Sequence, residues 1–340
     1  MMSANKRVSV VIPCRNEEQY IAKCIESVLT NNYPSELLDV FICDGMSTDA
    51  TREIVRHFSE NKRVTLLDNH EITTPYALNL GIEKSQADII IILGAHAEID
   101  SNYIKLCVDT FSLNHEIGCV GGMLDTISLD ENSAAIALAM SSVFGVGNAH
   151  FRTGLKEGYV DTVAFGAYRR EVFEKVGMFD SALTRNQDDE FNFRLIQGGF
   201  RIYLNPKIRA KYYVRSSFSK LYKQYMQYGY WKVYVNRKLK AVTTIRQLAP
   251  PLWVLFLFSM PFAWLIHPIL GTIHLILLLI YLITSLLMGF RMSRNTKEFA
   301  LVCFAFYTLH FSYGTGYLHG ILDFFLLKKS PGNRNSTLSR

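Results

Sequence analysis

The sequence predicts an α/β protein in which a doubly wound, mostly parallel sheet is followed by a C-terminal α-helical membrane region. Short apolar runs alternate with helical patterns from residue 7 to residue 215. Ala249–Phe290 then contains no Asp, Glu, Lys or Arg, and Lys207–Arg246 contains basic residues but no acids. Strand–helix alternation is typical of a parallel sheet covered on both faces, and a long uncharged stretch is typical of membrane helices.

Composition excludes several classes of protein. About half of the 340 residues are hydrophobic (49%) and 19% are charged, which opposes intrinsic disorder and collagen. The six cysteines are scattered without a CxxC pair, so we expect neither a zinc finger nor a disulfide scaffold but reduced thiols in a cytosol-facing domain. The first apolar run is soon broken by charge, so no signal peptide is expected.

Each element of the sheet domain follows from the local pattern. Near-continuous apolar runs predict strands, and apolar residues at helical spacing predict the helices between them. Thr48 and Asp49 are well placed to cap the second helix. The predicted strands are Arg7–Pro13, Leu37–Cys43, Val64–Leu67 and Asp88–Leu93, and the predicted helices are Glu17–Thr30, Thr48–Ser59 and Pro75–Ser85.

Polar and acidic residues follow three of these strands, at the edge where doubly wound sheets bind ligands. They are Cys14–Glu17, Asp44–Asp49 and Gly94–Glu98. No GxGxxG or GxxxxGK[ST] motif occurs, which opposes a dinucleotide-dependent oxidoreductase and a P-loop kinase. Asp44 before Gly45 suits the hydroxyl and base N–H groups of a nucleotide, although an Asp-Gly turn linking strand to helix explains the same pair.

A second polar cluster opens a later helix with three consecutive acids, Asp188, Asp189 and Glu190. We expect Phe191, Leu195 and Ile196 to face the core. The acids can stabilise the helix N-terminus through its dipole, or one can serve as a general base because adjacent carboxylates raise one another's pKa. The cluster alone leaves both readings open.

The uncharged stretch predicts two membrane helices, near 250–267 and 270–290, joined by a tight turn at His267–Gly271. A buried hairpin of a soluble protein is the alternative. Basic residues flank both ends of the pair, which predicts that both ends are cytoplasmic. The basic tail conflicts with a single further span at 299–327, so that stretch is either re-entrant or interfacial, or the positive-inside tendency fails. We expect a multi-pass inner-membrane protein with a cytoplasmic sheet domain.

The segment Lys207–Arg246 holds eleven Lys or Arg residues, seven Tyr and Trp231. Basic and aromatic side chains suit the headgroup zone of a membrane, and they also suit nucleic acid. The adjoining apolar hairpin favours membrane lipids, so no nucleic-acid partner is expected. The same cations suit a pyrophosphate-linked lipid acceptor. The predicted parts are therefore a sheet domain at 1–215, interfacial linker helices at 216–248, a membrane region at 249–328 and a basic tail at 329–340.

Five segments follow one another along the first 215 residues: VSVVIPCRNEE (Val8–Glu18), DGMSTDAT (Asp44–Thr51), ALNLGI (Ala77–Ile82), DIIIILGAHAE (Asp88–Glu98) and RNQDDEFNFRLIQGG (Arg185–Gly199). In this order they resemble glycosyltransferase family 2, the inverting sugar transferases of GT-A fold. Two more, GVGNAHFR (Gly145–Arg152) and DTVAFGAYRREVFEKVGMFD (Asp161–Asp180), resemble its membrane-anchored succinoglycan-synthesis branch. The resemblance implies transfer of a hexose, glucose above all, from a UDP-sugar to a lipid-linked saccharide in exopolysaccharide or surface-glycan synthesis, alongside other polysaccharide-assembly proteins.

The resemblance also implies roles for individual residues. Asp188 would be the catalytic base that deprotonates the acceptor hydroxyl, and Asp44 would meet the uracil or ribose. The remaining nucleotide-sugar contacts would be Pro13, Arg15, Glu17, Ser47 and His96, and the acceptor or lipid side would hold Asp189, Gln227 and Trp231.

Two departures from the family pattern matter. Its metal-binding Asp-x-Asp reads Gly94-Ala95-His96 here, so a divalent cation, Mn²⁺ or Mg²⁺, would rest on His96 with Glu98 nearby, and imidazole favours Mn²⁺. His96 could instead bond the sugar or the diphosphate. Gln227–Trp231 lacks the Arg of processive synthases, which predicts short products. A polyprenyl-phosphate sugar synthase and a non-catalytic nucleotide-sugar-binding membrane scaffold remain alternatives.

Overall fold

The structure is a computed structural model that describes residues 6–154, 156–214 and 217–330. The chain divides into two compact units. Residues 1–126 and 150–213 form the first unit, and residues 127–149 and 214–340 form the second. The segment 127–149, which the sequence analysis placed in the sheet domain, thus belongs with the C-terminal helices.

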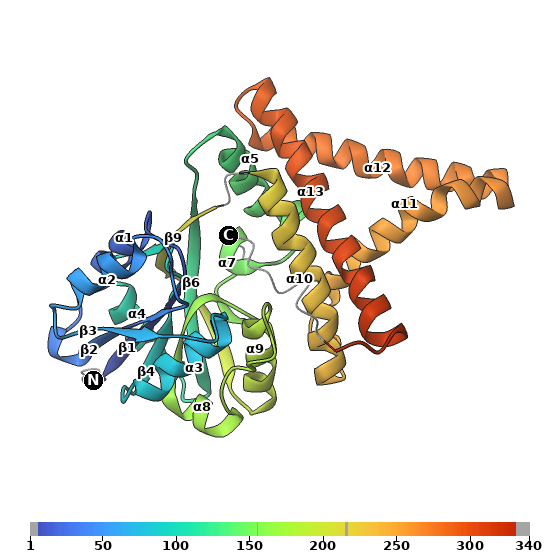
Figure 1. The fold of residues 1–340 in the computed structure, drawn as a ribbon. Coiled ribbons are helices and arrows are strands. Elements are labelled where there is room, and N and C mark those ends of the chain that lie inside the picture. Colours follow the sequence, from blue (N-terminus) through green and yellow to red (C-terminus); the bar gives the residue numbers. More distant parts are fainter. Residues whose placement is uncertain (1–5, 155, 215–216, 331–340) are drawn as a thin grey trace. The chain divides into compact units, whose positions relative to one another are not determined.

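The first unit alternates strands and helices along most of its length (Figure 1). All four predicted strands and all three predicted helices are present, with ends shifted by a few residues. The elements are β1 (Val8–Cys14), α1 (Ile21–Leu29), a 3-10 turn (Ser35–Leu37), β2 (Leu38–Asp44), α2 (Thr51–Phe58), β3 (Val64–Asp68), α3 (Thr74–Lys84), β4 (Ile89–Ile92), β5 (Ala97–Ile99), α4 (Tyr103–Phe111), β6 (Ile117–Ile127), α7 (His150–Thr153), β7 (Gly158–Val160), β8 (Ala164–Arg169), α8 (Arg170–Val176), α9 (Gln187–Gln197) and β9 (Arg201–Tyr213).

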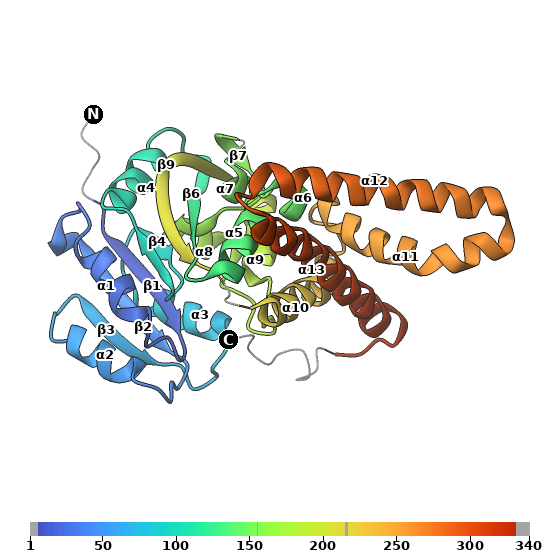
Figure 2. The same cartoon turned by 90° about the horizontal axis from the view of Figure 1, so that it is seen from above.

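The strands form one mixed sheet in the order β3-β2-β1-β4-β8-β6-β9-β5, with β7 paired to β9, and Figure 2 shows it from above. β1 pairs in parallel with β2 and β4, and β2 with β3. β8 runs antiparallel to both β4 and β6, and β9 antiparallel to β5 and β7. The predicted α/β class is confirmed, and its parallel part is the N-terminal half of the sheet.

Register brings the ends of neighbouring strands together at one edge. Cys14, the last residue of β1, lies opposite Asp44, the last residue of β2, and Asp44 lies opposite Asp68, the last residue of β3. Val8 and Ile12 in β1 are fully buried, as expected for a strand covered on both faces. The polar residues that follow these strands therefore meet at the carboxyl edge of the sheet.

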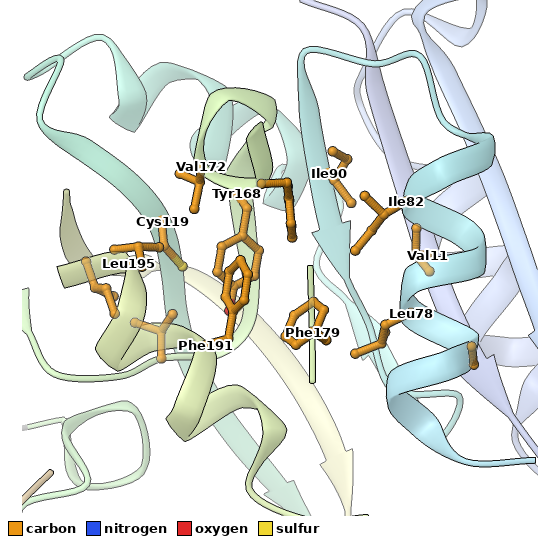
Figure 3. Close-up of a cluster of buried hydrophobic side chains, with 14 of the residues drawn as sticks. Val11, Leu78, Ile82, Ile90, Cys119, Tyr168, Val172, Phe179, Phe191 and Leu195 are labelled. Carbon is orange, nitrogen blue, oxygen red and sulfur yellow. The ribbon is translucent and has the colours of Figure 1, made fainter. Parts of the chain in front are cut away.

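A hydrophobic core joins α3 and α9 to the sheet (Figure 3). The ring of Phe191 in α9 stacks on Phe179 at 4.4 Å between centroids and meets Tyr168 of β8 at 5.5 Å. Phe191 and Leu195 are fully buried, as predicted. Ile196 is 44% exposed, so its predicted place in the core is wrong, because the next residue on a helix turns by about 100° away from the buried stripe.

The second unit is helical. Its elements are α5 (Glu131–Met140), α6 (Val143–Val146), α10 (Phe218–Leu239), a 3-10 turn (Ile245–Leu248), α11 (Ala249–Ile266), α12 (Pro268–Met292), α13 (Thr296–Ile321) and a π-helical turn (Leu322–Leu326). α13 contacts α5, α6, α10, α11 and α12, so it is the central helix of this unit.

α10 and α13 approach each other closely at two glycines. A Cβ atom at Gly316 would lie 2.0 Å from the carbonyl oxygen of Met226, and one at Gly229 would lie 2.1 Å from that of Tyr313. No side chain fits at such distances, so glycine on both helices lets the two backbones touch. Small residues at helix crossings serve the same purpose in membrane proteins.

The predicted hairpin is present as α11 and α12. His267 lies between them and caps the end of α11 and the start of α12. Among the described residues, two helical segments are long and apolar enough to cross a membrane, Ile245–Ile266 and Pro268–Met292. Their apolar side chains are largely exposed, which opposes a buried hairpin of a soluble core. The third apolar stretch forms α13, whose Phe306 and Leu309 are buried.

The segment 127–149 is anchored among these helices by Phe144. Its ring packs against Phe306 and His310 of α13, at 4.9 and 5.2 Å between centroids, and against Tyr281 of α12. One nitrogen of His310, Nε2, lies 2.8 Å from the carbonyl oxygen of Phe144, and the other, Nδ1, lies 2.8 Å from the hydroxyl of Tyr281. A chain excursion from the sheet therefore forms part of the helical unit.

Candidate active site

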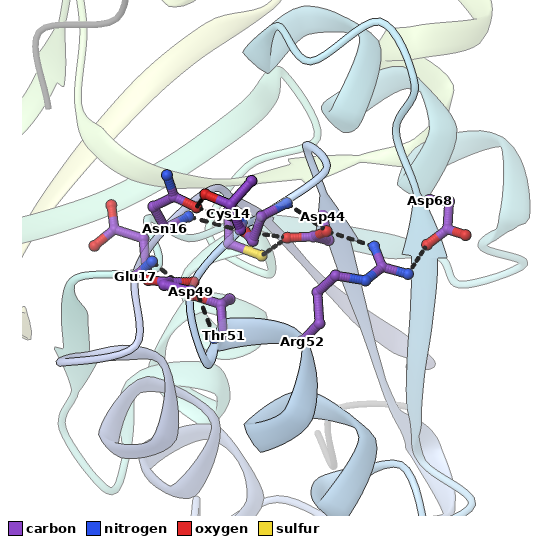
Figure 4. A network of polar contacts seen from close by, with 10 residues as sticks. Cys14, Asn16, Glu17, Asp44, Asp49, Thr51, Arg52 and Asp68 are labelled. Carbon is purple, nitrogen blue, oxygen red and sulfur yellow. Dashed lines mark hydrogen bonds and ion pairs between the residues drawn. The ribbon is translucent and has the colours of Figure 1, made fainter.

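The loops that follow β1 and β2 are bonded to each other at the carboxyl edge (Figure 4). The N–H of Asn16 donates to Ser47 Oγ at 2.9 Å, and its side-chain Oδ1 accepts from the N–H of Thr48 at 2.8 Å. The N–H of Glu17 donates to Thr51 Oγ1 at 2.8 Å. Asn16 adopts the left-handed backbone conformation (φ 54°), which Asn tolerates better than most residues.

The N-cap of α2 is Ala50, which has no side-chain cap, so the predicted capping of this helix by Thr48 or Asp49 is wrong. Asp49 instead joins the two loops. Its carboxylate accepts the N–H of Thr51, at the start of α2, and the N–H of Glu18 in the other loop. Burial acts to raise its pKa, but the hydrogen bonds from Thr51 and Glu18 outweigh burial and hold the pKa of Asp49 below its usual value.

Asp44 is fully buried at the centre of the network. Oδ2 accepts the N–H of Ser47 at 3.0 Å and Nη1 of Arg52 at 2.5 Å, and Oδ1 accepts the hydroxyl of Ser47. The thiol of Cys14 lies 3.8 Å from Oδ1, and burial together with Asp44 raises its pKa, so it stays protonated. A carboxylate offers about four lone-pair positions, and here the protein occupies them. Asp44 therefore holds the 44–51 loop in shape.

Arg52 links two strand ends. Its Nη1 binds the carboxylate of Asp44 and its Nη2 binds that of Asp68 at 2.7 Å. These two hydrogen bonds raise the pKa of Arg52 further above its already high value. The fixed fork of a guanidinium suits this bridging position better than an ammonium would. The side chain of Asp68 stays 47% exposed, so an oriented carboxylate lies at this edge.

The predicted residues of the nucleotide edge lie close together. Pro13, the last residue but one of β1, pairs with Cys43 of β2, and Arg15 packs beside Gly45. Glu17 is buried, and its Oε1 lies 3.3 Å from Nδ1 of His96, which follows β4. The structure thus joins the loops after β1, β2 and β4 into one site.

Gly94, at the first position of the motif, lies under the ring of Phe165. A Cβ atom at Gly94 would be 3.0 Å from a ring carbon of Phe165, closer than an ordinary van der Waals contact. Phe165 adopts a left-handed backbone conformation (φ 49°), and its carbonyl accepts the hydroxyl of Tyr103 at 2.6 Å. An aspartate at position 94 would have to displace this ring.

The side chains around Gly94–His96 do not form a preformed metal site. Within residues 6–154, 156–214 and 217–330, no three His, Cys, Asp or Glu side chains gather closely enough to hold an ion. His96 and Glu17 are paired with each other. Glu98, expected near the ion, accepts the hydroxyl of Tyr213 and pairs with Lys211 at 3.7 Å instead.

Asp188 lies in the exposed first turn of α9. One turn further on, Nδ2 of Asn192 donates to Thr162 Oγ1 at 3.1 Å, three residues before Phe165. Residues four apart lie on the same face of a helix, so Asp188 lies on the face of α9 that also carries Asn192. Burial raises the pKa of Tyr168 in β8, and the nearby Cys119 and Asp188 raise it further.

The three acids of α9 have different surroundings. Glu190 is fully buried, and its two oxygens accept Nε and Nη2 of Arg194, each at 2.8 Å. Arg194 also donates to the carbonyl oxygens of Val176 and Met178. Arg194 therefore ties α9 to the segment that precedes it, and Glu190 holds the guanidinium of Arg194 in place. Asp189 is half-buried and Asp188 exposed.

The predicted acceptor-side residues of α10 lie in the second unit. Gln227 and Trp231 are both buried. The ring of Trp231 meets those of Tyr230 and Tyr234 at 6.1 and 5.8 Å between centroids.

Sequence reasoning missed several residues of the site. Arg52 and Arg152 carry no recognisable motif spacing, and the position of Phe165 depends on its backbone conformation. Arg152 falls inside the GVGNAHFR segment, which was the one available signal.

Comparison with known proteins identifies the class of this protein. Residues 9–177 match the profile of glycosyl transferase family 2. Together with the relatives below, this match shows that the chain belongs to glycosyltransferase family 2 and is a glycosyltransferase.

Two relatives are more than 30% identical. The dolichyl N-acetyl-α-D-glucosaminyl phosphate 3-β-D-2,3-diacetamido-2,3-dideoxy-β-D-glucuronosyltransferase of Methanococcus voltae is 34% identical over 68% of this chain and 74% of the relative. The succinoglycan biosynthesis protein ExoA of Rhizobium meliloti is 32% identical over 71% of this chain and 73% of the relative. Similarity to the branch expected from the sequence is thereby confirmed.

The fold recurs in a solved structure. The mannosyltransferase PcManGT of Pyrobaculum calidifontis, in complex with GDP-Man and Mn²⁺, aligns with a TM-score of 0.62 at 17% identity. The alignment covers 94% of this chain and 88% of that chain. The GT-A-like fold with a helical C-terminal region is thereby confirmed.

Proposed function

We propose that this glycosyltransferase moves a hexose, glucose by resemblance, from a UDP-sugar to a lipid-linked saccharide at the membrane surface, in surface-glycan synthesis. The names of the relatives support a lipid-linked or polysaccharide product, since one acts on a dolichyl phosphate sugar and the other in succinoglycan biosynthesis. The two apolar helices support a membrane location.

The observation that carries the catalytic part of this proposal is the position of Asp188. Its carboxylate is exposed in the first turn of α9, and α9 is bonded through Asn192 to the segment that precedes Phe165 at the strand edge. A carboxylate in that position can take the proton of the acceptor hydroxyl as the oxygen attacks the anomeric carbon. A single displacement inverts the configuration, so no covalent nucleophile is needed.

The nucleotide edge would be formed by the loops after β1 and β2. We propose that Pro13, Arg15, Glu17 and Ser47 line the nucleotide and that His96 faces the sugar or its diphosphate. Asp44 would contribute chiefly by holding the 44–51 loop, since Ser47 and Arg52 occupy its carboxylate. The predicted divalent cation stays a prediction, and turnover in Mn²⁺, Mg²⁺ and excess chelator tests it.

The experiment that tests the function is turnover of a labelled nucleotide-sugar panel by membranes that contain the protein, followed by lipid extraction. A sugar–lipid product several residues long supports the proposal, whereas a single sugar on polyprenyl phosphate identifies a polyprenyl-phosphate sugar synthase. Absence of turnover with every donor would favour the remaining alternative, a non-catalytic membrane scaffold that binds a nucleotide-sugar.

Asp188→Asn is the matching variant because it keeps the shape of the side chain but removes the proton acceptor. We expect turnover to fall by about 10²–10⁴-fold, the usual contribution of a general base, while UDP affinity hardly changes. Asp189→Asn is the control, with a much smaller effect. If Asp189→Asn is the inactive variant, the base is assigned one residue too early.

Membrane orientation has its own test. We propose that both ends of the α11–α12 hairpin and the sheet unit are cytoplasmic and that Gln227, Trp231 and Asp189 lie on the acceptor and lipid side. A reporter after Arg294 should behave as cytoplasmic, and one near Pro268 as external. The reverse pattern refutes the orientation.

A further inference from the structure

Arg152, in the short helix α7, lies close to the candidate site through the ring of Tyr212. Its guanidinium carbon is 5.3 Å from the centroid of the Tyr212 ring, and the imidazole of His96 is 5.1 Å from the same ring. His96 in turn contacts Glu17. Arg152 therefore belongs to the cluster of side chains that surrounds the Gly94–His96 position.

The guanidinium of Arg152 carries a donor that the protein does not use. Its Nη1 is buried and has no hydrogen-bond acceptor among the residues that the structure describes. The guanidinium carbon lies 5.5 Å from the centroid of the Phe151 ring and also faces the ring of Tyr212. The faces of these rings stabilise the positive charge, but they do not provide a lone pair that accepts a hydrogen bond. Buried charged donors in native proteins have acceptors, so this N–H is suited to an anionic ligand.

A positive charge is needed near the Gly94–His96 position. The leaving group of a nucleotide-sugar is a diphosphate, and its charge must be compensated for the bond to the sugar to break. Gly94 supplies no ligand there, and Glu98 is bonded to Tyr213 and Lys211. A guanidinium is planar and always charged, and it can give two parallel hydrogen bonds to phosphate oxygens.

We propose that Arg152 binds the diphosphate of the nucleotide-sugar donor and stabilises the negative charge that develops on it. This inference rests on the proposed function, because it presupposes a nucleoside-diphosphate donor. In the transfer, the acceptor oxygen forms a bond to the anomeric carbon and its proton passes to the carboxylate of Asp188. The bond between that carbon and the diphosphate oxygen breaks, and the electron pair stays on the diphosphate beside Arg152.

The test compares nucleotide binding by the full-length protein in detergent, with excess chelator, for Arg152→Gln and Arg152→Lys. Arg201→Gln is the matched control, because Arg201 also lies on a tyrosine ring, that of Tyr159, at 3.6 Å, but at the far end of β9 from Tyr212. The ligands are UDP, GDP, ADP, CDP and their nucleosides, titrated calorimetrically.

We expect Arg152→Gln to weaken binding of the preferred nucleoside diphosphate by about 10- to 100-fold, as for loss of a charge-assisted hydrogen bond. Binding of the matching nucleoside should not change, Arg152→Lys should be intermediate, and Arg201→Gln should resemble the wild type. These results cannot arise from a purely structural role, which would weaken nucleoside and diphosphate alike.

Three results would count against the proposal, each in a distinct way. Unchanged diphosphate affinity in Arg152→Gln overturns it while leaving the proposed function intact. Equal loss of nucleoside and diphosphate binding in both Arg152 variants makes Arg152 a structural residue and also overturns it. A wild-type protein that binds none of the diphosphates, with added Mn²⁺ or Mg²⁺ as well as with chelator, refutes the proposed function itself.

Discussion

The ion pair between Glu190 and Arg194 is predicted to decide whether α9 keeps its position. Glu190→Gln preserves the volume and one acceptor oxygen but leaves the guanidinium of Arg194 without its buried counter-charge. Glu190 is fully buried and accepts two hydrogen bonds of 2.8 Å from Arg194. Removal of one partner from a buried pair costs about 3–5 kcal/mol.

The cost here should fall somewhat below that range. The side chain of Arg194 is 24% exposed, so water can solvate part of the guanidinium once the carboxylate is gone. Its hydrogen bond to Met178, at 2.8 Å, survives the substitution. We therefore expect a loss of about 2–4 kcal/mol in the local stability of α9.

Amide hydrogen exchange measures this loss where it occurs. A peptide covering α9 should exchange about 30- to 1000-fold faster in Glu190→Gln, since each 1.4 kcal/mol is tenfold in the opening equilibrium. Turnover should fall as well, although Asp188 is untouched. Asp189→Asn, on the same turn, serves as the control and should cost about 1 kcal/mol or less.

A double variant separates charge from shape. Glu190→Leu with Arg194→Met removes both charges, and apolar replacement of a buried pair is often neutral. Protection of α9 should then recover in part relative to Glu190→Gln, because the hydrogen bonds of Arg194 to the carbonyls of Val176 and Met178 are lost as well. If exchange in Glu190→Gln stays within about threefold of the wild type, the pair does not hold the helix and the reasoning is refuted.

Two further predictions concern packing and pH. Gly316→Ala should lower the stability of the full chain to heating in detergent by about 1–3 kcal/mol, because the new Cβ would lie 2.0 Å from the Met226 carbonyl oxygen. Thr315→Ala is the control and should leave the stability unchanged. Equal losses in the two variants would contradict the close contact between α10 and α13. Tyr213 donates to Glu98, which with burial raises its pKa to about 12 from the ordinary 10.0. The stability it adds is therefore complete below about pH 10 and disappears as the pH rises to about 12. Unfolding midpoints of the wild type and Tyr213→Phe should converge over that interval, and a gap that persists beyond it would show that the hydrogen bond is not responsible.

Local patterns sufficed for the parallel half of the sheet. Ile89–Ile92 is continuously apolar, and Val8–Ile12 is apolar apart from Ser9, because both faces of those strands are covered. The boundaries of both strands can therefore be predicted from the sequence. The antiparallel strands β6, β8 and β9 were not predicted individually: β6 and β8 mix buried and half-buried positions, and β9 also has exposed ones. Their order in the sheet depends on pairing between distant segments, which periodicity does not encode.

The candidate site shows the same division. The residues that follow the parallel strands were predicted, because strand ends in a parallel sheet meet at one edge. The Arg52 bridge and the position of Arg152 arise from contacts between segments far apart in sequence. The distinct surroundings of Asp188 and Glu190 depend on which face of α9 is buried, and three adjacent acids give no sign of that difference.

The excursion 127–149 restricts how the enzyme can be shortened. A chain cut near residue 215, the natural choice for a soluble catalytic fragment, would retain α5 and α6 but lose α13 and α12. Phe144 would then have neither Phe306 nor Tyr281 to cover it, and the apolar face of α5 would be open to water. Such a fragment is expected to aggregate unless this excursion is replaced by a short polar link between β6 and α7, so crystallographic or solution work on the sugar-transfer half must redesign that loop rather than only remove the membrane helices.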